Sequence, residues 1–218
     1  MPFASSLFKM SIAKEGYPFI LIAALLALLA FALDRQWVGL VFVFLAFAFS
    51  GFFRDPERVP PGGEGLILSP ADGRVLGIKR VEKERLFEGT ETRVSIFMSP
   101  LNVHVNRAPV QGMVEEVRYQ KGSFFAAYRE EASENNEKNA LRIVDGKGRK
   151  FAVVQIAGVL ARRIVCYAKK GDSLELGQRF GLIMFGSRVD LFLPPGSRVD
   201  VVQGQRVRAG ETVIGRLQ

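Results

Sequence analysis

Two apolar runs near the N-terminus constrain the fold of this chain more than any other feature. Residues 18–33 and 37–53 form runs of 16 and 17 residues, and only Asp34, Arg35 and Gln36 separate them. These lengths approach the roughly 17–25 residues of a membrane-spanning helix. Neither run has the polar stripe of a core helix, and a signal peptide has one apolar core rather than two. The pattern predicts an antiparallel α-helical membrane hairpin over residues 1–53.

Two alternatives to a spanning hairpin stay open, namely a hairpin that dips into one leaflet and a helical pair buried in a soluble core. Lys9 and Lys14 precede the runs, and Arg54 and Arg58 follow them. The positive-inside rule therefore predicts that both ends, and everything after the hairpin, lie on the cytoplasmic side of the inner cell membrane.

The charge balance favours an anionic partner. The chain has 30 Lys and Arg against 22 Asp and Glu, a net charge of +8. Beside a hairpin, that charge indicates anionic membrane lipids. The 18 Phe lie mostly in the membrane and core runs, without a basic and aromatic stripe, so we expect no nucleic-acid partner.

Residues 54–63 are rich in Pro and Gly and predict a linker, and residues 64–218 predict a mainly β domain. The turn at residues 70–73 contains Asp-Gly between two apolar runs, which predicts a β-hairpin of residues 65–69 and 74–78. Alternating residues at 93–98, 103–106, 141–144 and 151–156 predict further strands. Residues 157–167 fit either a short helix or a strand.

A weak repeat lies near the C-terminus. Residues 171–181 and 204–215 both read Gly, two residues, an apolar residue, two residues, Gly. Two glycine turns around a short strand explain this spacing, and two ordinary hairpins would explain it as well. The repeat resembles the lipoyl and biotinyl type of β fold, so the expected fold class is a lipoyl/hybrid-motif-like β domain preceded by the helical hairpin.

Few residue types are available for chemistry. Cys166 and His104 are the single cysteine and histidine of the chain, which excludes an internal disulfide and a cysteine-cluster zinc site, and we expect no metal. Ser187 follows Gly186 between two apolar strand-like runs. A strand bulge with a surface serine explains that dipeptide locally. Asp72 in a turn, His104 on a strand and the polar segment 135–139 also have ordinary structural explanations.

Taken together, four motifs carry a resemblance to a family. Ser-Pro-Ala-Asp-Gly at 69–73, Ser-Pro-x-x-x-His at 99–104, Asn-Glu at 136–137 and Gly-Ser at 186–187 follow one another in this order. The set, with its start beside a membrane, resembles phosphatidylserine decarboxylase of the short, membrane-anchored proenzyme type. The resemblance covers residues from about 64 to 218.

The resemblance implies self-cleavage between Gly186 and Ser187 into a large subunit, 1–186, and a small subunit, 187–218. The small subunit would begin with a pyruvoyl group made from Ser187, the only cofactor implied. With it the enzyme would convert phosphatidylserine into phosphatidylethanolamine. Ser187, His104 and Asp72 are the implied catalytic residues, because an imidazole oriented by a carboxylate suits deprotonation of a hydroxyl.

Two positions depart from the pattern of many family members. The family motif Leu-Gly-Ser-Thr reads Phe-Gly-Ser-Arg here, and Arg107 occupies the place of a second histidine three residues after the first. His104 must then act alone as the base, or Asp72 must act with less help. A guanidinium fork fits a phosphate or carboxylate, so Arg107, together with Asn136 and Glu137, is a candidate for substrate binding.

Other functions remain compatible with the residues. A membrane-anchored lipoyl-like adaptor would need neither Ser187 nor His104. A membrane-bound serine hydrolase would use Ser187, His104 and Asp72, although the Gly-x-Ser-x-Gly elbow is missing. The sequence is also compatible with a homo-oligomer.

Overall fold

The computed structural model describes residues 10–80, 92–128, 132, 135–159, 163–184 and 187–217. The chain divides into two compact units, residues 1–57 and 58–218. Gly186, one of the two residues of the predicted cleavage site, lies outside the described residues. Ser187 lies within them.

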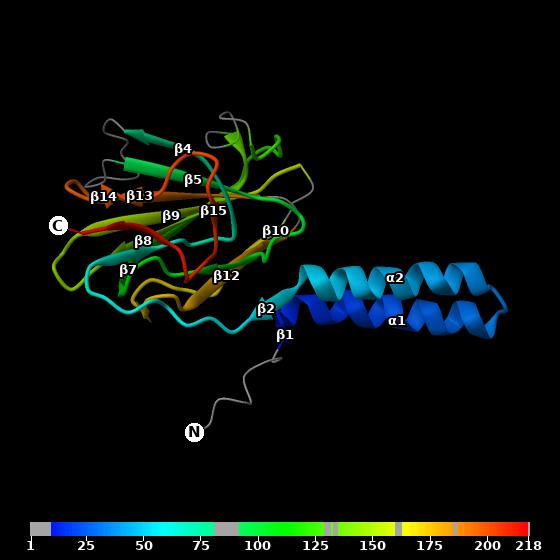
Figure 1. The fold of residues 1–218 in the computed structure, drawn as a ribbon. Helices are drawn as coiled ribbons and strands as arrows, with labels where there is room; N and C mark the ends of the chain where they lie inside the picture. Colours follow the sequence, from blue (N-terminus) through cyan, green and yellow to red (C-terminus); the bar gives the residue numbers. More distant parts are fainter. Residues whose placement is uncertain are drawn as a thin grey trace, which may run out of the picture. The chain divides into compact units, whose positions relative to one another are not determined.

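The first unit is a helical hairpin closed by a short strand pair. It contains β1 (Met10–Ile12), the 3-10 helix η1 (Lys14–Gly16), α1 (Tyr17–Ala32), α2 (Gln36–Phe52) and β2 (Arg54–Pro56). Strands β1 and β2 pair antiparallel, and α1 and α2 lie side by side (Figure 1). The turn between the helices includes Asp34, whose φ of 54° is left-handed.

Small residues allow the two helices to approach closely. Ala23, Ala27 and Ala30 of α1 are buried. A Cβ on Gly39 of α2 would lie 2.4 Å from the Phe31 ring, so a larger residue there would require that ring to move. The large apolar side chains point away from this interface; those more than half exposed include Leu21, Leu25, Leu28, Trp37, Phe44 and Phe47.

One helix of the hairpin has the length and composition of a membrane span. The stretch Lys14–Ala32 is 19 residues long and apolar enough to cross a bilayer, whereas Gln36–Phe52 is a shorter apolar helix.

The second unit is built of antiparallel strands. They are β3 (Leu66–Leu68), β4 (Gly73–Arg80), β5 (Thr92–Met98), β6 (Val105–Arg107), β7 (Gly112–Gln120), β8 (Lys138–Val144), β9 (Lys150–Ile156), β10 (Arg163–Cys166), β11 (Ser173–Leu174), β12 (Arg179–Met184), β13 (Ser187–Leu193), β14 (Arg198–Val199), β15 (Arg206–Val207) and β16 (Val213–Arg216). The mainly β prediction is confirmed for this unit, and the open choice at residues 157–167 resolves to a strand over 163–166.

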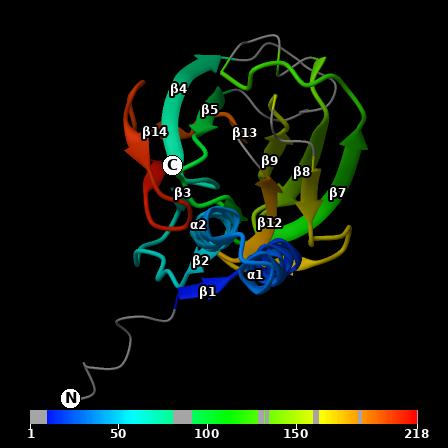
Figure 2. The same cartoon turned by 90° about the vertical axis from the view of Figure 1, so that its right-hand side faces the viewer.

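The described strands form one large and two small sheets. The eight-stranded sheet has the order β11-β7-β8-β9-β13-β5-β4-β15, and the three-stranded sheets have the orders β10-β12-β6 and β14-β16-β3. The large sheet curves, so that β4 and β7 lie on opposite sides of the unit (Figure 2). Ile96, Leu141, Val153, Val189 and Leu191 from its central strands belong to the core. Strand β13 therefore lies in the middle of the fold.

The hairpin predicted around Asp72-Gly73 is wrong. Strand β3 pairs with β16 in a small sheet, while β4 pairs with β5 and β15 in the large one. The turn thus passes from one sheet to another. Gly73 is required there by packing, because an added Cβ would lie 2.0 Å from the Phe97 carbonyl oxygen.

The weak glycine repeat belongs to a larger structural repeat. Strands β3, β4, β15 and β16 of one half correspond to β6, β7, β11 and β12 of the other. Leu174 pairs with Gly112 as Val207 pairs with Gly73. The glycines at 171, 177, 204 and 210 all have positive φ. The two halves therefore share a backbone plan, whereas a lipoyl-like identity stays a prediction.

Irregularities in the strands follow the same repeat. The β4–β5 register shifts between Val75 and Gly77, and the β7–β8 register shifts between Val114 and Glu116. The β6–β12 and β3–β16 pairs also share a shift, placing Asn106 where the other half has Ile67. Side chains that differ between these matched positions are therefore not dictated by the backbone.

Candidate active site

Ser187 is the first residue of β13 and is completely buried. It pairs with Met98 at the end of β5, and its Oγ donates a hydrogen bond to Met98 Sδ at 3.3 Å. A thioether is a weak acceptor, so the hydroxyl is positioned without being strongly held. The hydroxyl is also shielded from water.

A hydrogen-bonded series of buried side-chain amides begins at Met98. Asn106 Nδ2 approaches Met98 Sδ at 3.8 Å and donates to the Pro70 carbonyl at 3.4 Å. Gln155 Nε2 donates to Asn106 Oδ1 at 2.9 Å, and Asn139 Nδ2 donates to Gln155 Oε1 at 3.2 Å. Sequence reasoning missed Asn106 and Gln155, although each interrupts an apolar strand and could have been noticed for that reason.

His104 is buried, with only 2% of its surface exposed. Its Nδ1 lies 2.9 Å from the Asn102 carbonyl oxygen. A carbonyl only accepts hydrogen bonds, so Nδ1 carries the proton in the neutral ring and Nε2 carries the lone pair. Nε2 is also buried. The ring is thus prepared to accept a proton at Nε2 in a site shielded from solvent.

Asp72 holds a buried arginine. Its carboxylate accepts two hydrogen bonds from Arg58, at 2.5 and 2.9 Å, and a third from the Ala209 backbone N–H at 2.8 Å. The imidazole of His104 is oriented by Asn102. The structure therefore does not pair Asp72 with His104, and the catalytic roles of both residues stay predictions. Arg58, which the sequence assigned to a linker, is a buried part of this unit.

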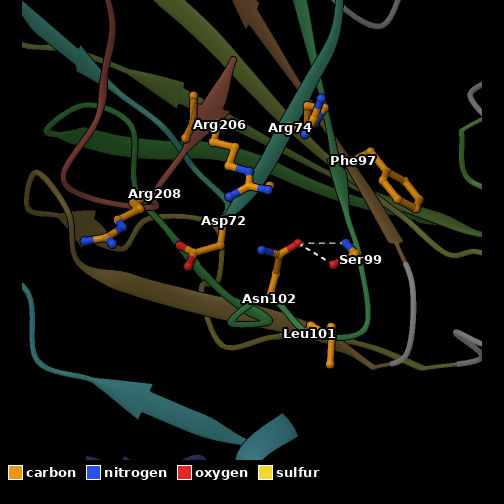
Figure 3. A pocket seen from close by; sticks show the side chains of 10 residues that line it. Asp72, Arg74, Phe97, Ser99, Leu101, Asn102, Arg206 and Arg208 are labelled. Atoms are coloured by element: carbon orange, nitrogen blue, oxygen red, sulfur yellow. Dashed lines mark hydrogen bonds between the residues drawn. The ribbon is translucent and has the colours of Figure 1, made fainter. Parts of the chain in front are cut away.

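A pocket of about 580 Å³ lies beside these residues. It is lined by Asp72, Gly73, Arg74, Phe97, Ser99, Leu101, Asn102, Arg206, Val207 and Arg208. Asn102 Oδ1 accepts hydrogen bonds from the Ser99 N–H and Oγ–H, both at 2.9 Å (Figure 3). These bonds fix the loop that carries His104. Leu101 on the same loop is 84% exposed.

Arg107 lies in the interior, where the two halves of the repeat meet. It is 5% exposed, and its Nη1 donates to the Gly177 carbonyl at 3.1 Å. An added Cβ on Gly210 would lie 2.9 Å from Arg107 Cδ, so the arginine packs directly on that glycine. These contacts give Arg107 a structural role. Its role in substrate binding stays a prediction.

Asn136 and Glu137 also hold neighbouring chain segments. The Asn136 amide accepts from the Phe125 N–H at 2.8 Å and donates to the Phe125 and Ala157 carbonyls at 2.8 and 2.7 Å. Burial and a hydrogen bond to Glu137 raise the pKa of the Tyr119 hydroxyl. Contact of either residue with substrate stays a prediction.

The described residues contain no group of three or more His, Cys, Asp or Glu side chains suited to a metal ion. Burial also raises the pKa of the Cys166 thiol, which keeps it in the less reactive protonated form. Among the described residues, Ser187, His104 and the arginine-lined pocket are thus the candidates for chemistry.

Comparisons with known proteins identify the family. Residues 45–215 match the model of phosphatidylserine decarboxylase. A phosphatidylserine decarboxylase proenzyme of Desulfotalea psychrophila is 43% identical over 210 residues, which cover 96% of this chain and 98% of the relative. That of Geobacter sulfurreducens is 48% identical over 216 residues, and that of Symbiobacterium thermophilum is 49% identical over 207 residues. These two matches cover 94% of this chain and at least 95% of each relative.

The chain belongs to the phosphatidylserine decarboxylase family. The resemblance inferred from the four motifs is thereby confirmed, and the protein is a carboxy-lyase. Arg188 directly follows Ser187, and its departure from the pattern of many family members stays a prediction. Arg188 is buried and donates to Asp190 at 2.6 and 3.1 Å and to Ser95 Oγ at 2.8 Å. Position 188 of this chain is thus occupied by an arginine that forms a buried ion pair within β13.

Proposed function

We propose that the protein is a phosphatidylserine decarboxylase proenzyme that cleaves itself between Gly186 and Ser187. The near full-length similarity to proenzymes supports the reaction class. The observation that carries the cleavage site is Ser187 itself, which begins β13 with its hydroxyl buried against Met98 Sδ. A surface serine would have no such environment.

The cleavage chemistry balances with the groups that are present. Ser187 Oγ attacks the Gly186 carbonyl carbon while a base takes the hydroxyl proton. The bond between that carbon and the Ser187 nitrogen then breaks, the nitrogen receives the proton, and the amide has become an ester. Removal of the Ser187 α-proton then expels the Gly186 carboxylate by elimination. Hydrolysis of the resulting dehydroalanine releases ammonia and leaves the pyruvoyl group. His104 is the candidate base, because its Nε2 carries the lone pair of the neutral ring.

The residues present fit such a group. The serine that would form it is dry, and the pocket beside it opens toward solvent, with the exposed Leu101 at its wall. A pyruvoyl carbonyl supplies an electron sink for loss of CO₂ from an amine-bearing substrate. The chain's own residues bind the substrate, exclude water at the buried positions and provide proton transfer at His104 Nε2.

The helical hairpin would place this chemistry at the lipid surface. Its large apolar side chains face outward, as with Leu25 and Phe47, which are 64% and 74% exposed. In water this surface would be strongly unfavourable, whereas hydrocarbon accepts it. We infer that residues 1–53 anchor the enzyme in the cell membrane, with residues 64–218 as the catalytic domain on the cytoplasmic face.

The test is the intact mass of the purified full-length protein. Two fragments are expected, the smaller beginning at position 187 with a blocked, ketone-bearing N-terminus. Ser187→Ala should remain a single inactive chain. Ser197→Ala is a matched control, because Ser197 also follows a glycine and precedes Arg-Val-Asp, yet it lies in a surface turn. This control should be cleaved and active. A single uncut chain in an active preparation would refute the proposal.

A further inference from the structure

Two arginines face each other across neighbouring strands at the edge of the large sheet. Arg206 of β15 is directly opposite Arg74 of β4, and both are exposed. Like charges directly opposite one another destabilise a sheet. Arg208, two residues further along, lines the same pocket. Such a concentration of positive charge is costly unless an anion binds there.

The acidic residue of the pocket does not neutralise these arginines. Asp72 is occupied by the buried Arg58 and by the Ala209 N–H. Within the part of the chain that the structure describes, neither Arg74 nor Arg206 forms an ion pair, and Arg208 approaches Glu211 only at 3.8 Å. In Figure 3 the Arg206 guanidinium extends toward Asp72 and Asn102. The pocket is therefore positively charged.

The backbone does not require arginine at these places. In the other half of the repeat, Ser173 pairs with Met113 where Arg206 pairs with Arg74. The residue corresponding to Arg208 is Glu175. The same strands and turns thus form with uncharged or acidic side chains. The arginines distinguish the half that carries the pocket.

The pocket shares a wall with the proposed catalytic centre. Ser99 lines it and directly follows Met98, which accepts the hydrogen bond of Ser187. Asn102 also lines it, and its carbonyl orients His104. A ligand bound by the arginines would lie beside both groups.

We propose that Arg74 and Arg206 form the subsite for the phosphate of the phospholipid headgroup, an inference that rests on the proposed function. A guanidinium binds phosphate with two parallel hydrogen bonds. The phosphodiester keeps its charge throughout decarboxylation, so a fixed cation binds it without opposing the reaction. The substrate carboxylate loses its charge, and pairing it with arginine would stabilise the ground state instead.

The experiment uses the full-length enzyme with Arg74→Gln and Arg206→Gln combined. Both residues are exposed and repel each other, so the variant should fold and cleave itself as the wild type does. The KM for phosphatidylserine in mixed micelles should rise about tenfold or more, because charged hydrogen bonds are lost, while kcat changes less than about twofold. Arg74→Lys with Arg206→Lys, which keeps the charge and loses the fork, should give an intermediate KM.

A matched control separates the pocket from general attraction to an anionic surface. Arg198→Gln with Arg216→Gln removes the same charge from an exposed pair bound to Asp200, outside the pocket. It should leave KM unchanged. Glycerophosphoserine should compete with substrate in the wild type and about tenfold less well in the pocket variant. Free serine, which has no phosphate, should compete equally weakly in both.

The outcomes separate the two proposals. If the wild type is uncut yet active, the proposed function fails, whatever the arginine variants do. If the wild type is cleaved and active but the pocket variant keeps its KM, the subsite alone is refuted. Inorganic phosphate that competes as well as glycerophosphoserine would also refute the headgroup assignment, because the pocket would then be a site for free anions.

Discussion

The same five residues, Gly-Ser-Arg-Val-Asp, occur twice in this protein and have opposite environments. At 186–190 the described residues Ser187, Arg188 and Asp190 are at most 2% exposed. At 196–200 the segment forms a surface turn and a two-residue strand, and the Arg198 side chain is 60% exposed. Local sequence alone therefore does not distinguish the proposed cleavage site from an exposed serine.

The two copies nevertheless share their local contacts. Arg188 Nε donates to Asp190 at 2.6 Å, and Arg198 Nε donates to Asp200 at 2.7 Å. Residues two apart on a strand lie on the same face, which explains the pair in β13, and Asp200 directly follows β14. The two segments differ in their neighbours: β13 lies between β5 and β9, whereas among the described strands β14 pairs with β16 alone. The same residues are therefore shielded from water in β13 and exposed to it around β14.

The largest expected difference in stability between the copies concerns their arginines. In a Ser187→Ala background, which should keep the chain in one piece, Arg188→Met should lower the free energy of unfolding by about 3–5 kcal/mol, because it removes the cation of a buried ion pair with Asp190. Arg198→Met should leave it unchanged within error. Urea unfolding of the full chain in detergent measures both. Equal losses would show that burial does not separate the two copies.

The buried amides of Asn106, Gln155 and Asn139 next to Met98 are the second feature that distinguishes the surroundings of Ser187. Asn106→Leu removes the acceptor of Gln155 and should cost about 1–3 kcal/mol. Self-cleavage followed by mass spectrometry should also slow about tenfold, because Met98 and Ser187 are held less well. Ile67→Leu, at the corresponding position of the other half, should cost less than about 1.5 kcal/mol and leave the cleavage rate unchanged. An unaltered cleavage rate in Asn106→Leu would show that these amides do not position Ser187 for cleavage.

Glycine has a conformational role in the exposed copy. Gly196 has a φ of 77°, and nothing lies within 4 Å of an added Cβ. Gly196→Ala should therefore cost only the left-handed strain, about 1–2 kcal/mol, and leave self-cleavage intact. Gly77→Ala, with equal space and no positive φ, is the control and should cost less. An equal loss in both variants would contradict the strain argument.

The smallest effect is expected at the exposed carboxylate. Hydrogen bonds from Arg198 hold the pKa of Asp200 below its ordinary value, with a further contribution from Arg216. A lowered folded pKa stabilises the protein above the unfolded pKa, and this stabilisation disappears as pH falls through the folded pKa. The melting temperature of Asp200→Asn should therefore lie slightly below that of the chain with Asp200 intact at pH 7. The two melting temperatures should converge near pH 2. Thermal melts across this pH range, again in the Ser187→Ala background, measure the difference. A difference that grows on acidification would contradict a stabilising effect of the lowered pKa.

Several features could be read from the sequence. The apolar runs predicted the two helices because their composition suits no other element of that length, and the helices end close to the predicted limits. The ordered motifs around Asp72, His104 and Ser187 identified the family. The prediction of a hairpin at Asp72-Gly73 failed because turn residues specify only a local bend. Strand partners from distant segments of the chain decide which sheet each arm joins.

The sequence by itself thus determined the helical unit and the strand-rich remainder, which depend on residues close in the chain, and the family, which depends on the order of four short motifs. Only the tertiary structure decided which of the two serines is buried, that Asp72 binds Arg58 rather than His104, and that Arg74 faces Arg206 in one pocket. The physical reason is that burial and strand register are set by contacts between distant segments. One copy of the pentapeptide thus forms a surface turn, and the other contains the peptide bond that we propose the protein cleaves.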